Sequence, residues 1–135
     1  MALYARLHIQ GHTNEKKGIR VLSSDIEFLQ EFEPASGAPA AKVNAGKIDL
    51  IIAIENDAEL LTWMLRPSLT KNGKIVYSGK DNGKIIKTLE FTDALLVRYH
   101  ERFREFEMTT ISITITAKKL KLVGALTENR WSLTD

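Results

Sequence analysis

An alternation of apolar and polar residues with a period of two runs through most of this chain and predicts a mainly β fold. Residues 3–10 alternate in this way. Residues 19–32 do so too, and one face of that segment carries Leu22, Ser24, Ile26, Phe28, Gln30 and Phe32. Residues 47–55 are the most apolar segment, with apolar side chains on both faces of its middle. We therefore expect two half-buried strands and a third that is covered on both sides.

A repeat of Asn-Gly-Lys-Ile, at 72–75 and again at 82–85, predicts two turns that bracket one strand. Asn-Gly adopts the positive φ angles of a tight turn at little steric cost, and it is a strong hairpin signal between alternating apolar flanks. Residues 80–83 are thus expected to form a hairpin loop. The first copy follows Arg66-Pro67, so residues 68–73 are expected to turn the chain from a helix into the sheet.

One short helix is predicted at about 57–66, because apolar residues recur there at helical spacing. Asn56 is the expected N-cap, and Glu59 is its expected capping-box partner. The apolar stripe of this helix consists of Leu60, Leu61, Met64 and Leu65. Trp63 lies off that stripe, and the size of its ring favours packing against a neighbouring element or chain.

Residues 93–107 fit either a helix or a strand. The β-rich block before them favours a strand over about 94–102, followed by a charged turn. The next segment is a clear strand, in which hydroxyl side chains alternate with one face made of Thr109, Ile111, Ile113, Ile115 and Ala117. A strand this long and uncharged is either central in a sheet or pairs with another subunit. If the strand pairs with another subunit, the interface residues are Thr109, Ile111, Ile113 and Ile115.

Residues 33–46 interrupt the β pattern with prolines, glycines and alanines and contain few large apolar groups. A loop of this length inside a compact domain is uncommon, and such loops are usually functional or disordered. We expect this loop to contact another molecule, with plain disorder as the alternative.

Composition indicates a single domain over residues 1–135, of which 44% are hydrophobic. The 19 basic and 17 acidic residues give a formal charge of +2, too balanced to favour nucleic acid or an acidic membrane as a partner. The chain has no cysteine, which excludes disulfides and thiolate catalysis. Residues 1–10 lack the pattern of a secretory signal, and no apolar run is long enough to span a membrane, so we expect a cytoplasmic protein before any export.

Residue types typical of catalytic sites form no recognisable pattern. His8, His12 and His100 are scattered, whereas a metal site needs three or four convergent ligands. Residues 23–25 lack the glycine-flanked turn of a serine nucleophile, and no glycine spacing fits a phosphate-binding loop. His100 and Glu101 are adjacent, so on a strand they would point to opposite faces. We expect no catalytic residue, no metal site and no cofactor.

Several segments, in order along nearly the whole chain, look like the tube protein of type VI secretion systems, and most of all like the Bacteroidetes-type Hcp proteins. The N-terminal half of the likeness consists of YARLHI at 4–9, RVLS at 20–23, WMLRP at 63–67 and LTKNGKIV at 69–76. The C-terminal half consists of KTLEFTDA at 87–94, YHE at 99–101, MTT at 108–110 with the strand after it, and ENRW at 128–131.

This resemblance implies a structural role and no catalytic residues. It implies a β-barrel of two packed antiparallel sheets with one short flanking helix, hexameric rings, and a hollow tube of stacked rings related to phage tail tubes. A contracting sheath would expel the tube with its spike and effector proteins, and the baseplate would be a further partner. The long strands would line the lumen. By position, the loop at 33–46 would reach an adjacent ring, which makes ring-stacking candidates of Glu33, Pro34, Ser36, Pro39, Lys42 and Asn44.

Two other functions fit the same residues. The chain could be the tube subunit of a related phage-derived contractile injection system, which would share the fold. It could also be a monomeric barrel that binds an apolar ligand inside, as lipocalin-like barrels do. A structural tube subunit is the function that we expect.

Overall fold

The computed structural model describes residues 3–29, 45–54 and 57–124, and it confirms a mainly β chain with one short helix. The strands are β1 (Leu3–Ile9), β2 (Ile19–Leu29), β3 (Ala45–Ala53), β4 (Lys71–Gly79), β5 (Ile85–Arg102) and β6 (Thr110–Gly124). The helix α1 (Ala58–Leu65) lies between β3 and β4 in the sequence. The terminal residues around Trp131 fall outside the described residues.

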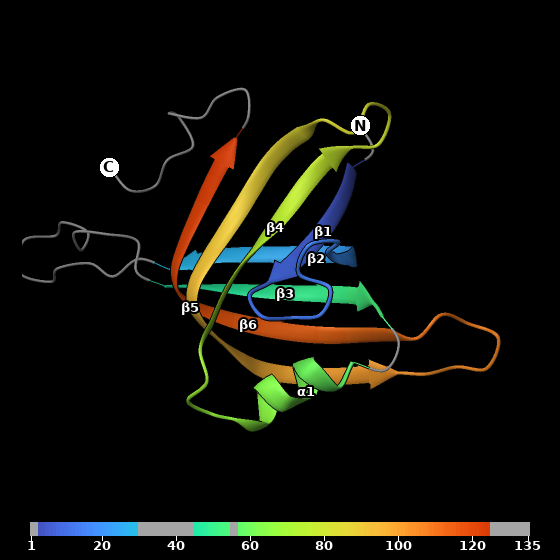
Figure 1. Cartoon of the computed structure of the whole chain (residues 1–135), viewed down its shortest axis with the longest axis vertical. Helices are drawn as coiled ribbons and strands as arrows, with labels where there is room; N and C mark the ends of the chain where they lie inside the picture. Colours follow the sequence, from blue (N-terminus) through green and yellow to red (C-terminus); the bar gives the residue numbers. More distant parts are fainter. Residues whose placement is uncertain (1–2, 30–44, 55–56, 125–135) are drawn as a thin grey trace, which may run out of the picture.

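All neighbouring strands are antiparallel, and they close into a barrel in the order β1-β2-β3-β6-β5-β4. Figure 1 shows that the strands form two groups that cross each other. We call one group the transverse layer; it contains β2, β3, residues 110–117 of β6 and residues 94–102 of β5. The other group, the upright layer, contains β1, β4 and the remaining parts of β5 and β6. The two long strands therefore belong to both layers and join them.

Both long strands change phase at the corner where they pass from one layer to the other. On β5 the buried residues are Leu89 and Phe91 before the corner, and Ala94 and Leu96 after it, so the spacing of two is broken once. Asp93 lies at this break with a φ of 52°, and its backbone N–H donates to Asn72 Oδ1 at 2.9 Å. A single residue in this conformation bends the strand without ending it. The prediction of a strand after residue 93 is confirmed.

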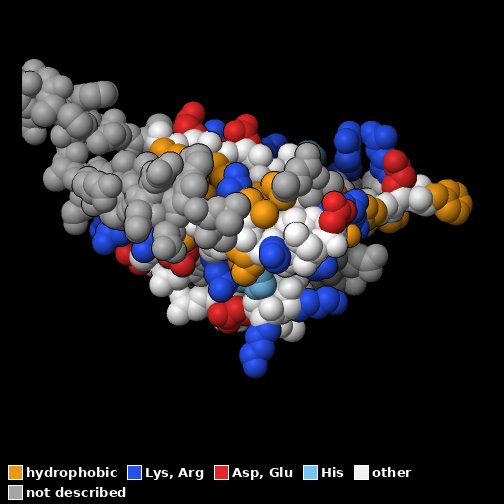
Figure 2. Space-filling model, turned by 90° about the horizontal axis from the view of Figure 1, so that it is seen from above, with side chains coloured by type: hydrophobic (Ala, Val, Ile, Leu, Met, Phe, Trp, Pro, Cys, Tyr) orange, Lys and Arg blue, Asp and Glu red, His pale blue; other side chains and the backbone are white. Residues whose placement is uncertain are grey.

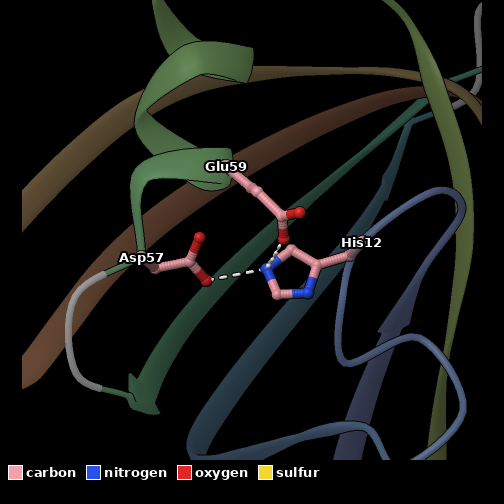
Figure 3. A group of neighbouring side chains, drawn as sticks. All are labelled: His12, Asp57 and Glu59. Atoms are coloured by element: carbon pink, nitrogen blue, oxygen red, sulfur yellow. Dashed lines mark hydrogen bonds and ion pairs between the residues drawn. The ribbon is translucent and has the colours of Figure 1, made fainter.

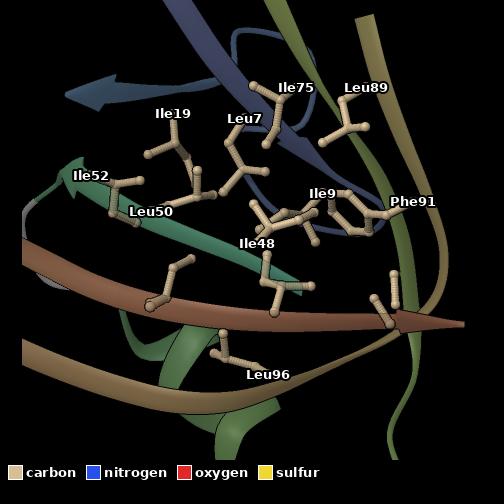
Figure 4. Packing of buried hydrophobic residues seen from close by; sticks show 14 of the residues in the cluster. Leu7, Ile9, Ile19, Ile48, Leu50, Ile52, Ile75, Leu89, Phe91 and Leu96 are labelled. Carbon is tan, nitrogen blue, oxygen red and sulfur yellow. The ribbon is translucent and has the colours of Figure 1, made fainter. Parts of the chain in front are cut away.

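The barrel interior is filled by aliphatic side chains from every strand (Figure 4). Leu7, Ile48, Ile52, Ile75 and Leu89 have no exposed surface. Each such side chain stabilises the fold by about 1.5–3 kcal/mol relative to an exposed one, before the entropy of ordering is subtracted. A filled interior holds the strands in place and leaves function to the outer surfaces and edges.

The predicted hairpin at 80–83 is confirmed, but the first Asn-Gly has another role. Gly79 N–H donates to Lys84 O and Gly83, with a φ of 69°, donates to Gly79 O, which closes the β4–β5 turn. Asn72 and Gly73, however, lie inside β4 rather than in a turn before it. A Cβ on Gly73 would collide with the ring of Phe91 and with the carbonyl oxygen of His8. This glycine therefore permits close packing and not a turn, which corrects the expectation for residues 68–73.

The helix forms where it is predicted, with a different cap and a different buried face. Asn56 lies outside the described residues; the N-cap is Asp57, whose side chain accepts from Leu60 N–H at 2.9 Å. The side chains buried by this helix are Leu60 and Trp63, while Leu61 and Leu65 are 41% and 71% exposed.

Trp63 is thus part of the core, because its ring packs inward and its Nε1–H donates to Leu69 O at 2.9 Å. Packing of Trp63 on a neighbouring element is confirmed, and the expected stripe through Leu61 and Leu65 is wrong.

In β2 a β-bulge between Val21 and Ser23 changes which residues face inward. After the bulge, Ile26 and Phe28 pack against the core as predicted, but Leu22 is 40% exposed. The extra residue shifts the alternation by one position, and strict alternation from the sequence could not foresee that. The strand is described as far as Leu29, so Gln30 and Phe32 lie outside the described residues.

Candidate assembly interface

The transverse layer ends in two strands that are each paired on one side only among the described residues. β1 pairs with β2 only from Ile19 to Val21, so residues 22–29 of β2 pair with β3 alone. β4 pairs with β5 as far as Ala94, so residues 95–102 of β5 pair with β6 alone. Unpaired strand edges present rows of backbone N–H and C=O groups, which another strand can satisfy. These two edges are the first candidates for contact with another chain.

The two edges have compatible directions. β2, β3, β6 and β5 are antiparallel in succession, so β2 and β5 run in opposite directions across the layer. The β5 edge of one copy placed beside the β2 edge of another, turned the same way, would continue the antiparallel alternation. Leu22 and Val97, which lie on these two strands, are 40% and 46% exposed. Both edges thus offer apolar surface beside backbone groups that no second described strand pairs, with α1 packed against β5.

The strand predicted to form an interface is instead central in the layer. β6 is paired to β3 on one side and to β5 on the other. Ile111, Ile113 and Ile115 point into the barrel and are at most 1% exposed, and Thr109 directly precedes the strand with an intermediate exposure. These isoleucines bury their side chains in the core of their own protomer. The alternative that the sequence left open, a central strand, is correct.

The outward face of the same strand is lined by hydroxyl groups. Ser112, Thr114 and Thr116 alternate with the buried isoleucines. Thr114 Oγ1 donates to Asp49 Oδ1 on β3 at 2.6 Å, and Asp49 also lies 3.7 Å from Lys47 Nζ. Asp25 is directly opposite Asp49 in the register of β2 and β3. The outer face of β6 therefore carries polar side chains, unlike the barrel interior.

The candidate stacking loop is outside the described residues, and so are Glu33, Pro34, Ser36, Pro39, Lys42 and Asn44. The strands that flank it are described. Residue 45 already belongs to β3, and Gly46 is buried, where an added Cβ would collide with Leu120. The loop expected at 33–46 therefore ends before Ala45.

A cluster that the sequence did not predict joins the β1–β2 loop to the start of α1 (Figure 3). His12 Nε2 lies 2.8 Å from Asp57 Oδ2 and 3.1 Å from Glu59 Oε2. His12 and Asp57 are 8% exposed, whereas the Glu59 carboxylate is partly open. Because 45 residues separate His12 from Asp57, no spacing in the sequence signals this group.

The hydrogen bonds of the cluster define the tautomer of the neutral His12 ring. Asn14 N–H donates to His12 Nδ1 at 2.9 Å, so this nitrogen is an acceptor and the neutral ring carries its proton on Nε2. That proton is shared between the two carboxylates. A metal ion on Nε2 would need the proton to move to Nδ1, where the Asn14 N–H opposes it. The three side chains are of types that can bind a metal ion, but here they link the β1–β2 loop to the start of α1. We call His12, Asp57 and Glu59 the latch.

Hydrogen bonding and burial also shift three pKa values. Thr13 donates to Glu59 through both its N–H, at 3.0 Å, and its Oγ1, at 2.8 Å, and these bonds lower the pKa of Glu59. Burial raises the pKa of Tyr99 to about 12, with a further contribution from its hydrogen bond to Glu101. Burial also raises the pKa of Tyr77, and the bond that its hydroxyl donates to Ser24 at 2.9 Å opposes the shift. Each group is explained by packing between neighbouring strands and loops.

Comparison with known families decides what kind of protein carries these edges. The family described as hemolysin coregulated protein Hcp (TssD) matches residues 1–132. The chain belongs to the Hcp (TssD) family. It is a structural tube subunit of type VI secretion systems.

Solved structures of Hcp proteins have the same fold as this Hcp-family chain. Hcp1 from Flavobacterium johnsoniae is 26% identical with a TM-score of 0.68, over 90% of this chain and 96% of that one. Hcp1 from Salmonella typhimurium is 17% identical with a TM-score of 0.69, over 95% and 90% of the two chains. A structure described as the PVC sheath-tube complex of an extracellular contractile injection system shares the fold at 14% identity and a TM-score of 0.58, over 91% and 88%.

No curated protein sequence matches this Hcp-family chain. Within the described residues, no helix is long and apolar enough to cross a membrane. Of the histidines expected to be scattered, His12 lies in a cluster with Asp57 and Glu59. Glu101 bonds to Tyr99, two residues away on the same face, rather than to the adjacent His100.

Proposed function

We propose that this chain forms closed hexameric rings through the two edges of the transverse layer, and that the rings stack into the hollow tube of a type VI secretion system. The observation that carries the proposal is the pair of opposed, one-sided strands at the ends of a single four-stranded layer. Joined head to tail, β5 of each copy pairs with β2 of the next, and the contact repeats until the ring closes. The outer face with Ser112, Thr114 and Asp49 then lines the lumen, where a hydrated surface suits passing cargo.

In this proposal a contractile sheath, a spike and a baseplate surround and drive the tube, and effector proteins travel with it. Family membership and the shared fold of tube proteins in contractile injection systems support these partners. The part of the segment 33–46 that precedes β3 reaches the adjacent ring, in keeping with the flanking ends of β2 and β3, which lie at one end of the transverse layer. The protein is made in the cytoplasm and leaves through the apparatus.

A monomeric ligand-binding barrel is less well supported, because the barrel interior is filled by side chains such as Ile48, Ile52 and Leu89. A lipocalin-like barrel needs an internal cavity for its ligand.

Light scattering and negative-stain electron microscopy of the purified protein test the ring. We expect a species six times the mass of the 15.2 kDa chain and annular particles.

Leu22→Asp and Val97→Asp place a charge beside each edge and should lower the ring fraction at least tenfold, since an unpaired charge in an interface is unfavourable. Both side chains are exposed in the protomer, so the fold should persist. Ile51→Asp is the matched control: Ile51 is 38% exposed but lies on the central strand β3. A protein that stays monomeric at high concentration would contradict the proposal.

A further inference from the structure

The hairpin between β5 and β6 ends in an apolar tip that the fold of the protomer does not use. We call residues 103–108 the tip. Phe103, Phe106 and Met108 are 72%, 98% and 53% exposed. Figure 1 shows this hairpin extending beyond the end of the transverse layer, and Figure 2 shows apolar side chains at the end of the same projection. Exposed aromatic residues that gather on a projection mark contact sites on otherwise soluble surfaces.

The backbone of the tip holds one aromatic ring outward. Glu107 N–H donates to Arg104 O at 3.0 Å, which closes a four-residue turn with Phe106 at its third position. Phe106 has a φ of 66°, a conformation that residues with a Cβ rarely adopt and that favours glycine or asparagine. The ring gains no packing in the protomer in return for this strain. Strain of this kind at an exposed residue points to a use outside the protomer.

A second exposed apolar surface lies on α1. Leu61 and Leu65, four residues apart on α1, share one face of the helix and are 41% and 71% exposed. Pro67, just beyond the helix, is exposed as well. We call these three residues the helix patch. Figure 1 shows α1 beside β5, with the chain leaving the helix at the side opposite to the β5–β6 hairpin, so the C-terminal end of α1 points away from the tip.

We propose that the tip of one copy seats on the helix patch of a second copy in the next ring, so that Phe103 and Phe106 form an axial contact between stacked rings. The inference rests on the proposed ring. The two surfaces are different and the C-terminal end of α1 points away from the tip, so the contact is head to tail and repeats without closing on itself. Within the tip, Arg104 Nε lies 3.9 Å from Glu107 Oε2, so this pair is internally balanced and Glu105 carries the remaining charge.

The expected area explains why this contact works only in a ring. Two phenylalanines bury about 300–500 Å² together, whereas a stable interface needs about 800 Å² on each partner. One tip is therefore too small to hold two separate copies. Six tips that engage at once bury roughly 1,800 Å² or more and act multivalently, which raises the strength of the whole contact by about 10²–10⁴.

Electron microscopy of rings tests the contact with variants that spare the fold. Phe106→Gly keeps the turn, since glycine accepts its φ, and removes the ring; Leu65→Ser alters the helix patch at an exposed site. Each should leave rings intact and reduce the number of rings in stacks of three or more at least tenfold. Ile85→Ser, at an apolar residue that is 52% exposed and belongs to neither surface, is the matched control. Normal stacking of Phe106→Gly would overturn the proposal.

Mixing the two variants gives a stricter test. A Phe106→Gly ring keeps its helix patch and a Leu65→Ser ring keeps its tips, so the mixture should form pairs of rings and stop there. The chain has no native cysteine, so Glu105→Cys with Arg66→Cys, at exposed positions that keep Phe106 and Leu65, should form disulfides only between copies under a mild oxidant, as a ladder on a denaturing gel. Glu105→Cys with Ile85→Cys should not. Single rings in the mixture, or no ladder, would refute the axial contact, whereas failure of the wild type to form rings would refute the proposed function first.

Discussion

The imidazole of His12 and the carboxylate of Asp57 meet at 2.8 Å, although 45 residues separate them in the chain. Asp57 uses its second oxygen to cap α1 through Leu60 N–H. One buried carboxylate thus joins the β1–β2 loop to the start of the helix. The fold of this region depends on a long-range bond between two small polar groups rather than on apolar packing alone.

Removal of this bond should destabilise the protein. His12→Ala leaves the Asp57 carboxylate buried without its main partner, and we expect a loss of about 1–3 kcal/mol in the free energy of unfolding. Urea unfolding, followed by the fluorescence of the buried Trp63 at one protein concentration, measures it. His100→Ala, at an exposed histidine, should change stability by less than about 0.5 kcal/mol. Equal effects of the two substitutions would contradict the latch.

The tautomer of His12, with its proton on Nε2, gives a more specific prediction for Asp57→Asn than for His12→Ala. Asparagine is a good N-cap, so a purely capping role predicts little change. The asparagine amide has a single oxygen, so it can accept a hydrogen bond from either His12 Nε2–H or Leu60 N–H. Its NH₂ group must then face the other donor, and one hydrogen bond is lost. We expect a loss of about 1–2 kcal/mol. NMR of the imidazole nitrogens should find the proton on Nε2 in the wild type; a proton on Nδ1 would refute the assignment.

Gly73→Ala tests the corrected role of the first Asn-Gly. The new methyl group would meet the Phe91 ring and the His8 carbonyl, so neighbouring strands must move apart. We expect a loss of about 1–3 kcal/mol. Gly83→Ala has open space around the new Cβ and is strained only through its φ of 69°, and it should lose about 1 kcal/mol. Thermal unfolding of both variants gives the comparison, and a larger loss at Gly83 would contradict it.

The raised pKa of Tyr99 predicts a loss of stability in alkali. Its pKa is about 12 in the fold and 10.0 in the reference state. The neutral phenol is therefore favoured by folding, so this contribution is complete below pH 10 and is lost as the pH rises from 10 to 12. Tyr99→Phe should flatten the fall of the unfolding midpoint over this range. An unchanged pH profile would contradict the assignment.

The lowered pKa of Glu59 acts at the opposite end of the pH scale. Its folded pKa lies below the reference value of 4.5 because Thr13 donates two hydrogen bonds to the carboxylate. The contribution is therefore present above pH 4.5 and is lost as the pH falls through the lower folded value. Glu59→Gln should make acid unfolding below pH 4.5 less steep. The same steepness in both proteins would refute the role of Thr13.

Local patterns were sufficient to predict most elements of this fold. Period-two alternation predicted the strands, Asn82-Gly83 predicted the hairpin, and helical spacing predicted α1. These features depend on neighbours within a few residues, so the sequence contains their cause. The likeness to Hcp proteins, carried by segments along nearly the whole chain, predicted the family. A barrel followed from the family rather than from any single motif.

Tertiary structure alone decided which surfaces face another molecule. The isoleucines of β6 have the pattern of an interface strand and of a core strand alike, and only their pairing on both sides places them in the core. The bulge at Leu22, the close packing at Gly73 and the meeting of His12 with Asp57 depend on contacts between residues far apart in the chain. The sequence by itself determined the strands, the turn and the family, because those follow from local backbone preference and overall likeness. The tertiary structure decided the unpaired edges of β2 and β5, the exposed tip and the latch. Each of these features depends on whether a segment distant in the sequence packs beside it.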